Sequence, residues 1–126
     1  MIELAIKTAL ERITGLNVYP LLLPVNELEG VTYQRISDPL VATGMVRTSL
    51  VAARFQITLY LLDDYTRLVQ LENAIWAEWQ TIQHGEIDGY PVQYVRRDSI
   101  REDKEPQTGG STLYSRHRDF ILTFSE

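Results

Sequence analysis

The sequence predicts an α+β domain, in which two helices pack on one face of an antiparallel or mixed sheet of about four to five strands. Two segments, residues 2–14 and 65–83, carry apolar residues at helical spacing. A third segment, residues 50–62, alternates between apolar and mixed side chains as a half-buried strand does. Because no repeat or composition break divides the 126 residues, a single domain is expected over 1–126.

The N-terminal part begins with the helix predicted over residues 2–14, which Gly15 ends because glycine accepts a positive φ. Residues 16–20 include Pro20 and are expected to form an extended segment that could serve as an edge strand. Residues 31–37 follow as a strand. Residues 38–48 lack a clear periodicity and are predicted to form a long, mobile loop.

The central strand at residues 50–62 leads into Asp63-Asp64, which can cap the second helix. That helix is expected to run over 65–83 and to end at His84-Gly85, with Gly85 in a left-handed conformation. Its apolar stripe contains Leu68, Leu71, Ile75, Trp79 and Ile82.

A turn at Asp88-Gly89 precedes the last two predicted strands, residues 90–98 and 113–124. Together they are expected to form a long hairpin. Its tip, residues 99–111, is polar and contains Gly109-Gly110, so a mobile loop is predicted there.

Composition excludes several classes of protein. With 44% hydrophobic residues the chain can build a core, and its net charge of −5 argues against a dedicated nucleic-acid binder. The absence of cysteine excludes disulfides and thiolate sites and suits a reducing cytoplasm. Neither a signal peptide nor a membrane-spanning segment is expected, so the protein is predicted to be soluble.

Residues that could carry chemistry are few and scattered. His84 and His117 fall on different elements without a metal-binding motif, and Asp63-Asp64 are better explained as helix caps. Gly109-Gly110 lack the lysine and the strand-to-helix context of a phosphate-binding loop. We therefore expect no catalytic residue, no metal and no cofactor.

Glu72 falls inside the apolar stripe of the second helix, where a bare carboxylate is costly to bury. Either it reaches solvent at the margin of the stripe, or it pairs with an arginine such as Arg35 or Arg54, within one subunit or between two. Trp79 is expected in the core. Trp76 lies on the flank of the stripe, so it could equally serve the core or a subunit interface.

Basic residues gather at the hairpin, but acidic residues balance them. Residues 96–105 contain Arg96, Arg97, Arg101 and Lys104 together with four acids, so their net charge is zero. Such a mixture is typical of a solvated tip or of a protein contact. The expected interface residues are Arg35, Arg54, Glu72, Trp76, Arg96, Arg97 and Arg101.

Four stretches resemble the small phage and prophage tail terminator family, also called tail completion or minor tail proteins. They are the first helix with the prolines that follow it, the strand at 31–37, residues 54–60 leading into Asp64-Tyr65, and the closing strand at 118–124. The resemblance implies a ring, a homohexamer, that sits on the tail tube and stops its polymerisation. Its partners would be copies of itself, the tail tube protein and a head–tail neck or connector protein. It would be assembled in the host cytoplasm and located in the virion tail.

Three alternatives remain open on the sequence alone. A neck or head-completion adaptor would have a similar composition. A small α+β ligand-binding or enzymatic domain would need polar groups that converge on a pocket. An adaptor that binds the strand of another protein at its sheet edge would be monomeric without that partner.

Overall fold

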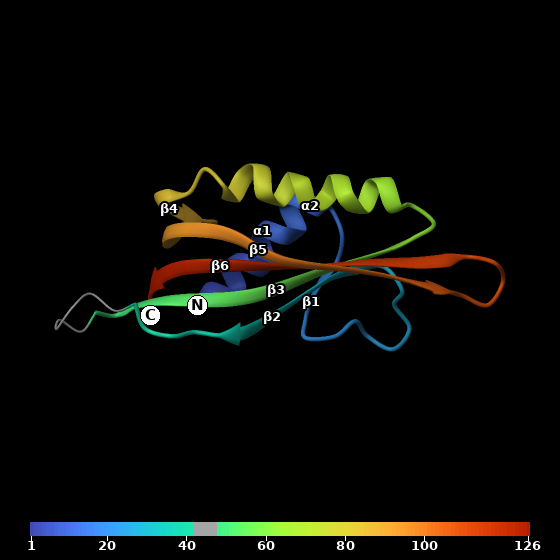
Figure 1. Ribbon diagram of the computed structural model, residues 1–126, viewed down its shortest axis with the longest axis horizontal. Coiled ribbons are helices and arrows are strands. Elements are labelled where there is room, and N and C mark those ends of the chain that lie inside the picture. Colours follow the sequence, from blue (N-terminus) through green and yellow to red (C-terminus); the bar gives the residue numbers. More distant parts are fainter. Residues whose placement is uncertain (42–47) are drawn as a thin grey trace.

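The computed structural model describes residues 1–41 and 48–126, which contain two helices and six strands (Figure 1). The helices are α1 (Ile2–Thr14) and α2 (Tyr65–Trp79). The strands are β1 (Val18–Pro20), β2 (Gly30–Ser37), β3 (Leu50–Leu62), β4 (Gln83–Ile87), β5 (Tyr90–Pro106) and β6 (Thr112–Ser125).

All six strands belong to one mixed sheet with the order β1-β2-β3-β6-β5-β4. The short edge pair β1–β2 is parallel, and every other pair is antiparallel. The predicted α+β class is confirmed, with one strand more than the upper expectation. The extended segment after α1 does form an edge strand.

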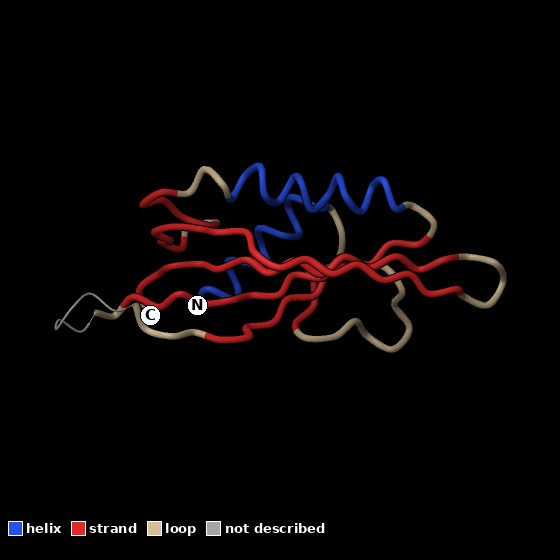
Figure 2. The backbone as a smooth tube through the Cα atoms, in the orientation of Figure 1, coloured by secondary structure: helices blue, strands red, loops and turns tan. Residues whose placement is uncertain are grey.

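Both helices contact the same face of the sheet (Figure 2). Arg35 of β2, Phe55 of β3 and Phe120 of β6 are cross-strand neighbours and therefore share a face. Glu3 of α1 binds Arg35 there, and Trp79 of α2 packs edge-on against Phe120 at 5.0 Å between ring centroids. The core between this face and the helices includes Ile6, Leu10, Phe55, Leu59, Leu68, Ile75, Trp79, Phe120 and Phe124.

The predicted caps of the two helices are partly confirmed. Gly15 ends α1 with φ 70°, and its N–H bonds the carbonyl of Glu11. Asp64 begins α2, and its carboxylate accepts a 3.0 Å hydrogen bond from the N–H of Arg67. Neighbouring Asp63 binds β6 instead of capping the helix, because its carboxylate accepts a hydrogen bond from the N–H of Thr112.

The end of α2 was predicted wrongly. The helix stops at Trp79, and Gln83–Ile87 forms β4 instead of a last helical turn and a cap. Asp88 and Gly89 have φ values of 42° and 86°, which suit a two-residue hairpin turn between Ile87 and Tyr90. Pairing with β5 therefore makes residues 83–87 a strand, and Gly85 has no left-handed conformation.

The loop predicted over 99–111 was also wrong in its extent. β5 continues to Pro106 and pairs with β6 up to Thr112, so only residues 107–111 connect the two strands. Of the other predicted loop, 38–48, the central residues 42–47 lie outside the described part. Leu40 forms an antiparallel bridge with Val51, so the start of that segment lies beside β3.

Candidate functional site

A cluster of buried charges joins α2 to the β5–β6 hairpin. Arg116 and Arg118 of β6 stand on the helix-covered face because they are four and two residues, respectively, from Phe120 along the same strand. Both arginines are about nine-tenths buried, and Glu72 of α2 is fully buried above them. The side chains of this helix therefore meet charged as well as apolar partners on the sheet.

Glu72 accepts hydrogen bonds from three arginines. Its Oε1 lies 2.7 Å from Nε of Arg118 and 3.2 Å from Nε of Arg116. Its Oε2 lies 3.4 Å from Nη1 of Arg97 on β5. Glu72 is therefore buried and paired with arginine, as one of the two sequence interpretations held, and it does not reach solvent at the margin.

The arginines named in that interpretation were the wrong ones. Arg35 binds Glu3, Asp38 and Glu126 near the other end of the sheet. Arg54 points to the face opposite the helices, because it alternates with Phe55 along β3. Neither side chain can reach Glu72, and the true partners come from the closing hairpin.

Trp76 and Arg97 complete the cluster at its rim. The guanidinium of Arg97 lies 5.1 Å from the centroid of the Trp76 ring, in cation–π geometry, while it also binds Glu72. The Trp76 ring also stacks on Phe120, with 6.2 Å between the ring centroids. Trp76 is half-buried, and within one subunit it packs against the core.

Glu102 ties the hairpin to the start of α2. Its Oε2 accepts hydrogen bonds of 2.8 Å from Tyr65 Oη and 2.7 Å from Nη1 of Arg116. Burial works to lower the pKa of Arg116, but the hydrogen bonds that Arg116 donates to Glu102 and Glu72 outweigh it and raise that pKa. Arg116 is thus a permanent cation held between one carboxylate of α2 and one of β5.

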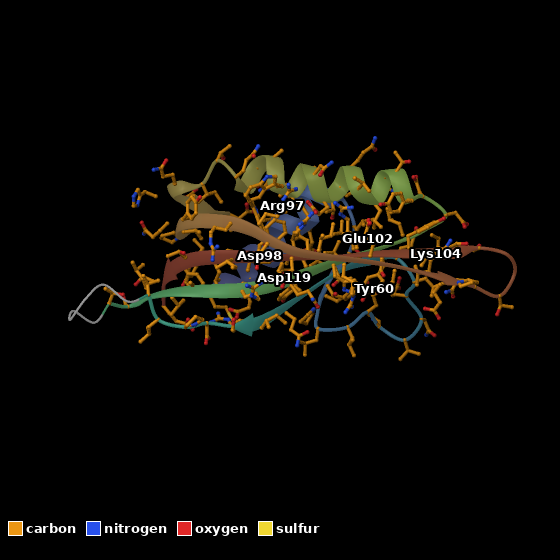
Figure 3. The ribbon with its side chains drawn as sticks, in the orientation of Figure 1. Tyr60, Arg97, Asp98, Glu102, Lys104 and Asp119 are labelled. Atoms are coloured by element: carbon orange, nitrogen blue, oxygen red, sulfur yellow. The ribbon has the colours of Figure 1, made fainter. Side chains whose placement is uncertain are left out.

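On the opposite face, Arg54 holds a bulge of β5 in place. The register with β6 shifts between Arg97 and Ile100, and Asp98 lies in this bulge. Nη1 of Arg54 is 2.6 Å from Oδ2 of Asp98 and 3.0 Å from Oδ2 of Asp119, an arrangement that lowers the pKa of Asp98. Figure 3 labels Asp98 of β5 and Asp119 of β6, which lie close together. From the helix side, Arg118 donates a 2.8 Å hydrogen bond to the carbonyl of Asp98.

Beyond Tyr94, β5 is an open edge of the sheet. β4 pairs with β5 only as far as Tyr94, and in the described part of the chain β6 is the one strand that pairs with residues 96–106. All of these residues are exposed. The tip of this hairpin also extends past the start of α2 (Figure 1). A free edge of this length is a surface on which another strand can pair.

The seven predicted interface residues therefore fall in three places. Glu72, Trp76 and Arg97 form one cluster between α2 and the hairpin. Arg54, Arg96 and Arg101 belong to the other face of the sheet, where Arg101 lies 3.4 Å from His117. Arg35 stands apart. Arg116, Arg118 and Glu102 were not predicted as site residues. The alternation of Arg116 and Arg118 with Phe120 along β6 could have indicated the two arginines, whereas Glu102 lies opposite Arg116 only because of the strand register.

Hollows on the described surface are small. One of about 330 Å³ is lined by the first turns of α1 and by Asp88, Gly89 and Tyr90. Another of about 200 Å³ lies on the open face beside His117 and Asp119. The pKa of His117 is lowered by burial and by neighbouring Arg101. Among the residues that the structure describes, no group of three or more His, Asp or Glu side chains could hold a metal ion.

In residues 1–41 and 48–126 no helix is both long and apolar enough to cross a membrane. Comparison with known proteins finds no family model that matches the chain, and no curated protein matches it.

Proposed function

We propose that this protein is a structural phage or prophage tail terminator, which forms a ring on the end of the tail tube. The ring stops polymerisation of the tube and offers a surface for joining the head or neck. Its partners are further copies of the chain, the tail tube protein and a head–tail connector protein. The observation that carries the proposal is the open edge of β5 on a firmly held hairpin.

An assembly protein needs a contact surface whose position is fixed before the partner arrives. Glu72 and Tyr65 of α2 hold the hairpin from one side, and Arg54 of β3 holds it from the other. Because these contacts already restrict the hairpin, it loses less conformational entropy when a partner binds. The edge is therefore presented at a defined angle to the rest of the domain.

Identical subunits close into a ring when a patch on one meets a different patch on the next and the rotation between them divides a full turn. The sheet has two different edges that could serve, β5 on one side and the short β1–β2 pair on the other. The net charge of −5 fits a ring through which DNA must slide, because an acidic protein does not grip phosphates.

A capping assay tests the proposal. Polymerising tail tube protein is imaged by negative-stain microscopy with and without this chain, and tube lengths are measured. We expect annular particles and shorter tubes that carry a ring at one end. Unchanged tube lengths, with this chain left as single subunits in solution, would contradict the proposal.

A further inference from the structure

The open edge of β5 carries charges in a self-complementary order. From residue 96 to residue 103 the sequence is Arg-Arg-Asp-Ser-Ile-Arg-Glu-Asp. The signs are therefore plus, plus, minus, two neutral positions, then plus, minus, minus. Each charged residue has the opposite sign to the one at the same distance from the centre, which lies between Ser99 and Ile100.

We infer that two copies of the chain pair antiparallel through these edges, about a two-fold axis at the Ser99–Ile100 position. In such a contact the numbers of any two paired residues add up to 199. Arg96 is then opposite Asp103, and Arg97 is opposite Glu102. Asp98 is opposite Arg101. Symmetry repeats every pair, so six pairs of opposite charge line the contact.

The bulge makes this register possible. Residues paired across antiparallel strands must lie on the same face of the sheet. In an unbroken strand, residues 96 and 103 would lie on opposite faces, because they are an odd number of positions apart. The extra residue between Arg97 and Ile100 removes this mismatch.

The register with β6 confirms that the charges face the required sides. Arg97 is opposite Phe120 and Glu102 is opposite Arg116, so both stand on the helix-covered face. Arg96 is opposite Ile121, and Asp103 is opposite Ser115, which places both on the other face. The Arg96–Asp103 and Arg97–Glu102 pairs of the contact are therefore consistent in both charge and face.

Other registers with consistent faces bring like charges together. A shift by two positions in one direction places Arg96 opposite Arg101. The same shift in the other direction places Arg97 opposite Lys104 and Asp98 opposite Asp103. Charged residues on an edge strand ordinarily prevent pairing between sheets. Here they disfavour the neighbouring registers and leave one that is attractive throughout.

This two-fold contact uses the same β5 edge as the head-to-tail contact of the proposed ring, so one edge takes part in only one of the two contacts at a time. The two-fold contact is therefore a contact between free subunits, and it does not depend on the ring. Because its charges are exposed, the contact should weaken as salt rises. Its test uses the isolated chain at low salt, without tail tubes, so its failure and the failure of the ring proposal are distinguishable.

The test exchanges charge between two variants, Arg96→Asp and Asp103→Arg. Each variant alone places like charges opposite each other twice, and we expect at least a tenfold rise in its dissociation constant by sedimentation equilibrium. A mixture of the two variants restores both pairs, so heterodimers should form with an affinity near that of the wild type. The matched controls are Arg67→Asp, at an exposed position of α2, and Glu105→Arg, which lies opposite the uncharged Tyr94 in the inferred contact. Circular dichroism checks that every variant is folded.

A spin label at Lys104→Cys reads the register directly, since the chain has no other cysteine. In the inferred contact the two labels are separated by roughly 26 Å, at about 3.3 Å for each of some eight residues. A shift by two positions changes this separation by about 7 Å. Single variants that associate as tightly as the wild type, a mixture no tighter than either variant, or a separation outside this range would each overturn the inference.

Discussion

The Nε atom of Arg118 on β6 lies 2.7 Å from Oε1 of Glu72 on α2, at a place where both side chains are buried. This bond joins the second helix to the closing strand inside one subunit. Removing one member of a buried ion pair leaves the other without compensation for its lost hydration. Glu72 is therefore expected to matter first for the stability of the fold, and for assembly through the hairpin that it holds.

Replacing Glu72 by Gln should lower the free energy of unfolding by about 3 kcal/mol, because Arg116 and Arg118 remain buried beside a neutral amide. Urea unfolding followed by circular dichroism measures this change. The matched control is Glu78→Gln, which removes an exposed partner of Arg12 and should cost less than about 1 kcal/mol. Equal effects of the two substitutions would show that the buried cluster contributes no more than a surface pair.

Phe120 contacts both tryptophans of the chain, in stacked contact with Trp76 and edge contact with Trp79. Phe120→Ala should destabilise the fold by about 3–5 kcal/mol through loss of burial and creation of a cavity. It should also change the tryptophan emission of the folded state. Tyr94→Ala, at a half-exposed position, is the control and should leave the emission unchanged. An unaltered spectrum for Phe120→Ala would contradict the packing described here.

Gly15, which ends α1 as predicted, and Gly85, which was wrongly predicted to end α2, should respond differently to substitution. Gly15→Ala forces a side chain into φ 70° and should cost about 1 kcal/mol, although the space around it is empty. Gly85→Ala meets only an ordinary contact, 3.7 Å from Ile82, and should change stability by less than about 0.5 kcal/mol. Thermal unfolding of both variants measures the difference. A larger loss of stability for Gly85→Ala than for Gly15→Ala would contradict the strand conformation of Gly85 and favour the left-handed cap that was predicted there.

The lowered pKa of His117 makes stability depend on pH. The unfolded chain binds a proton near pH 6.5, whereas the folded protein does so only at lower pH because of burial and Arg101. Between these two values the unfolded state holds more protons, so the free energy of unfolding falls as pH falls. This contribution is complete above about pH 6.5 and declines below it.

His117→Asn should therefore flatten the dependence of stability on pH between about 7 and 5. Urea midpoints at several pH values, for the wild type and the variant, measure it. Because Asn keeps a polar group near Thr58, whose hydroxyl is 2.9 Å from Nδ1, the comparison isolates the titration from the lost contact. Parallel curves for the two proteins would exclude His117 as the source.

Elements whose own residues determine their conformation could be predicted from the sequence. Alternation over β3 and helical spacing in α1 reflect burial on one side, and that pattern is local. β5 beyond Arg97 has no such pattern because both its faces are exposed, and its strand conformation comes from pairing with β6. β4 was missed for a similar reason, since Ile87 is its one buried residue.

In the candidate site, too, local patterns could be predicted from the sequence and contacts between distant elements could not. The position of Glu72 in the apolar stripe was evident from the helical period, so its need for a partner could be predicted. Its partners could not be chosen without the sheet order, which places β6, and with it Arg116 and Arg118, under α2. The bulge at Asp98 depends on contacts from both faces, and no local sequence pattern indicates it.

Self-association is the claim on which the proposed ring and the two-fold contact both rest, and the mass of the protein in solution as its concentration rises tests it most directly. A single chain has a mass of 14.5 kDa. We expect sedimentation equilibrium at low salt to give a mass that grows with concentration to at least twice this value. A mass that stays at that of one chain up to about millimolar concentration, where even weak specific contacts form, would contradict the account.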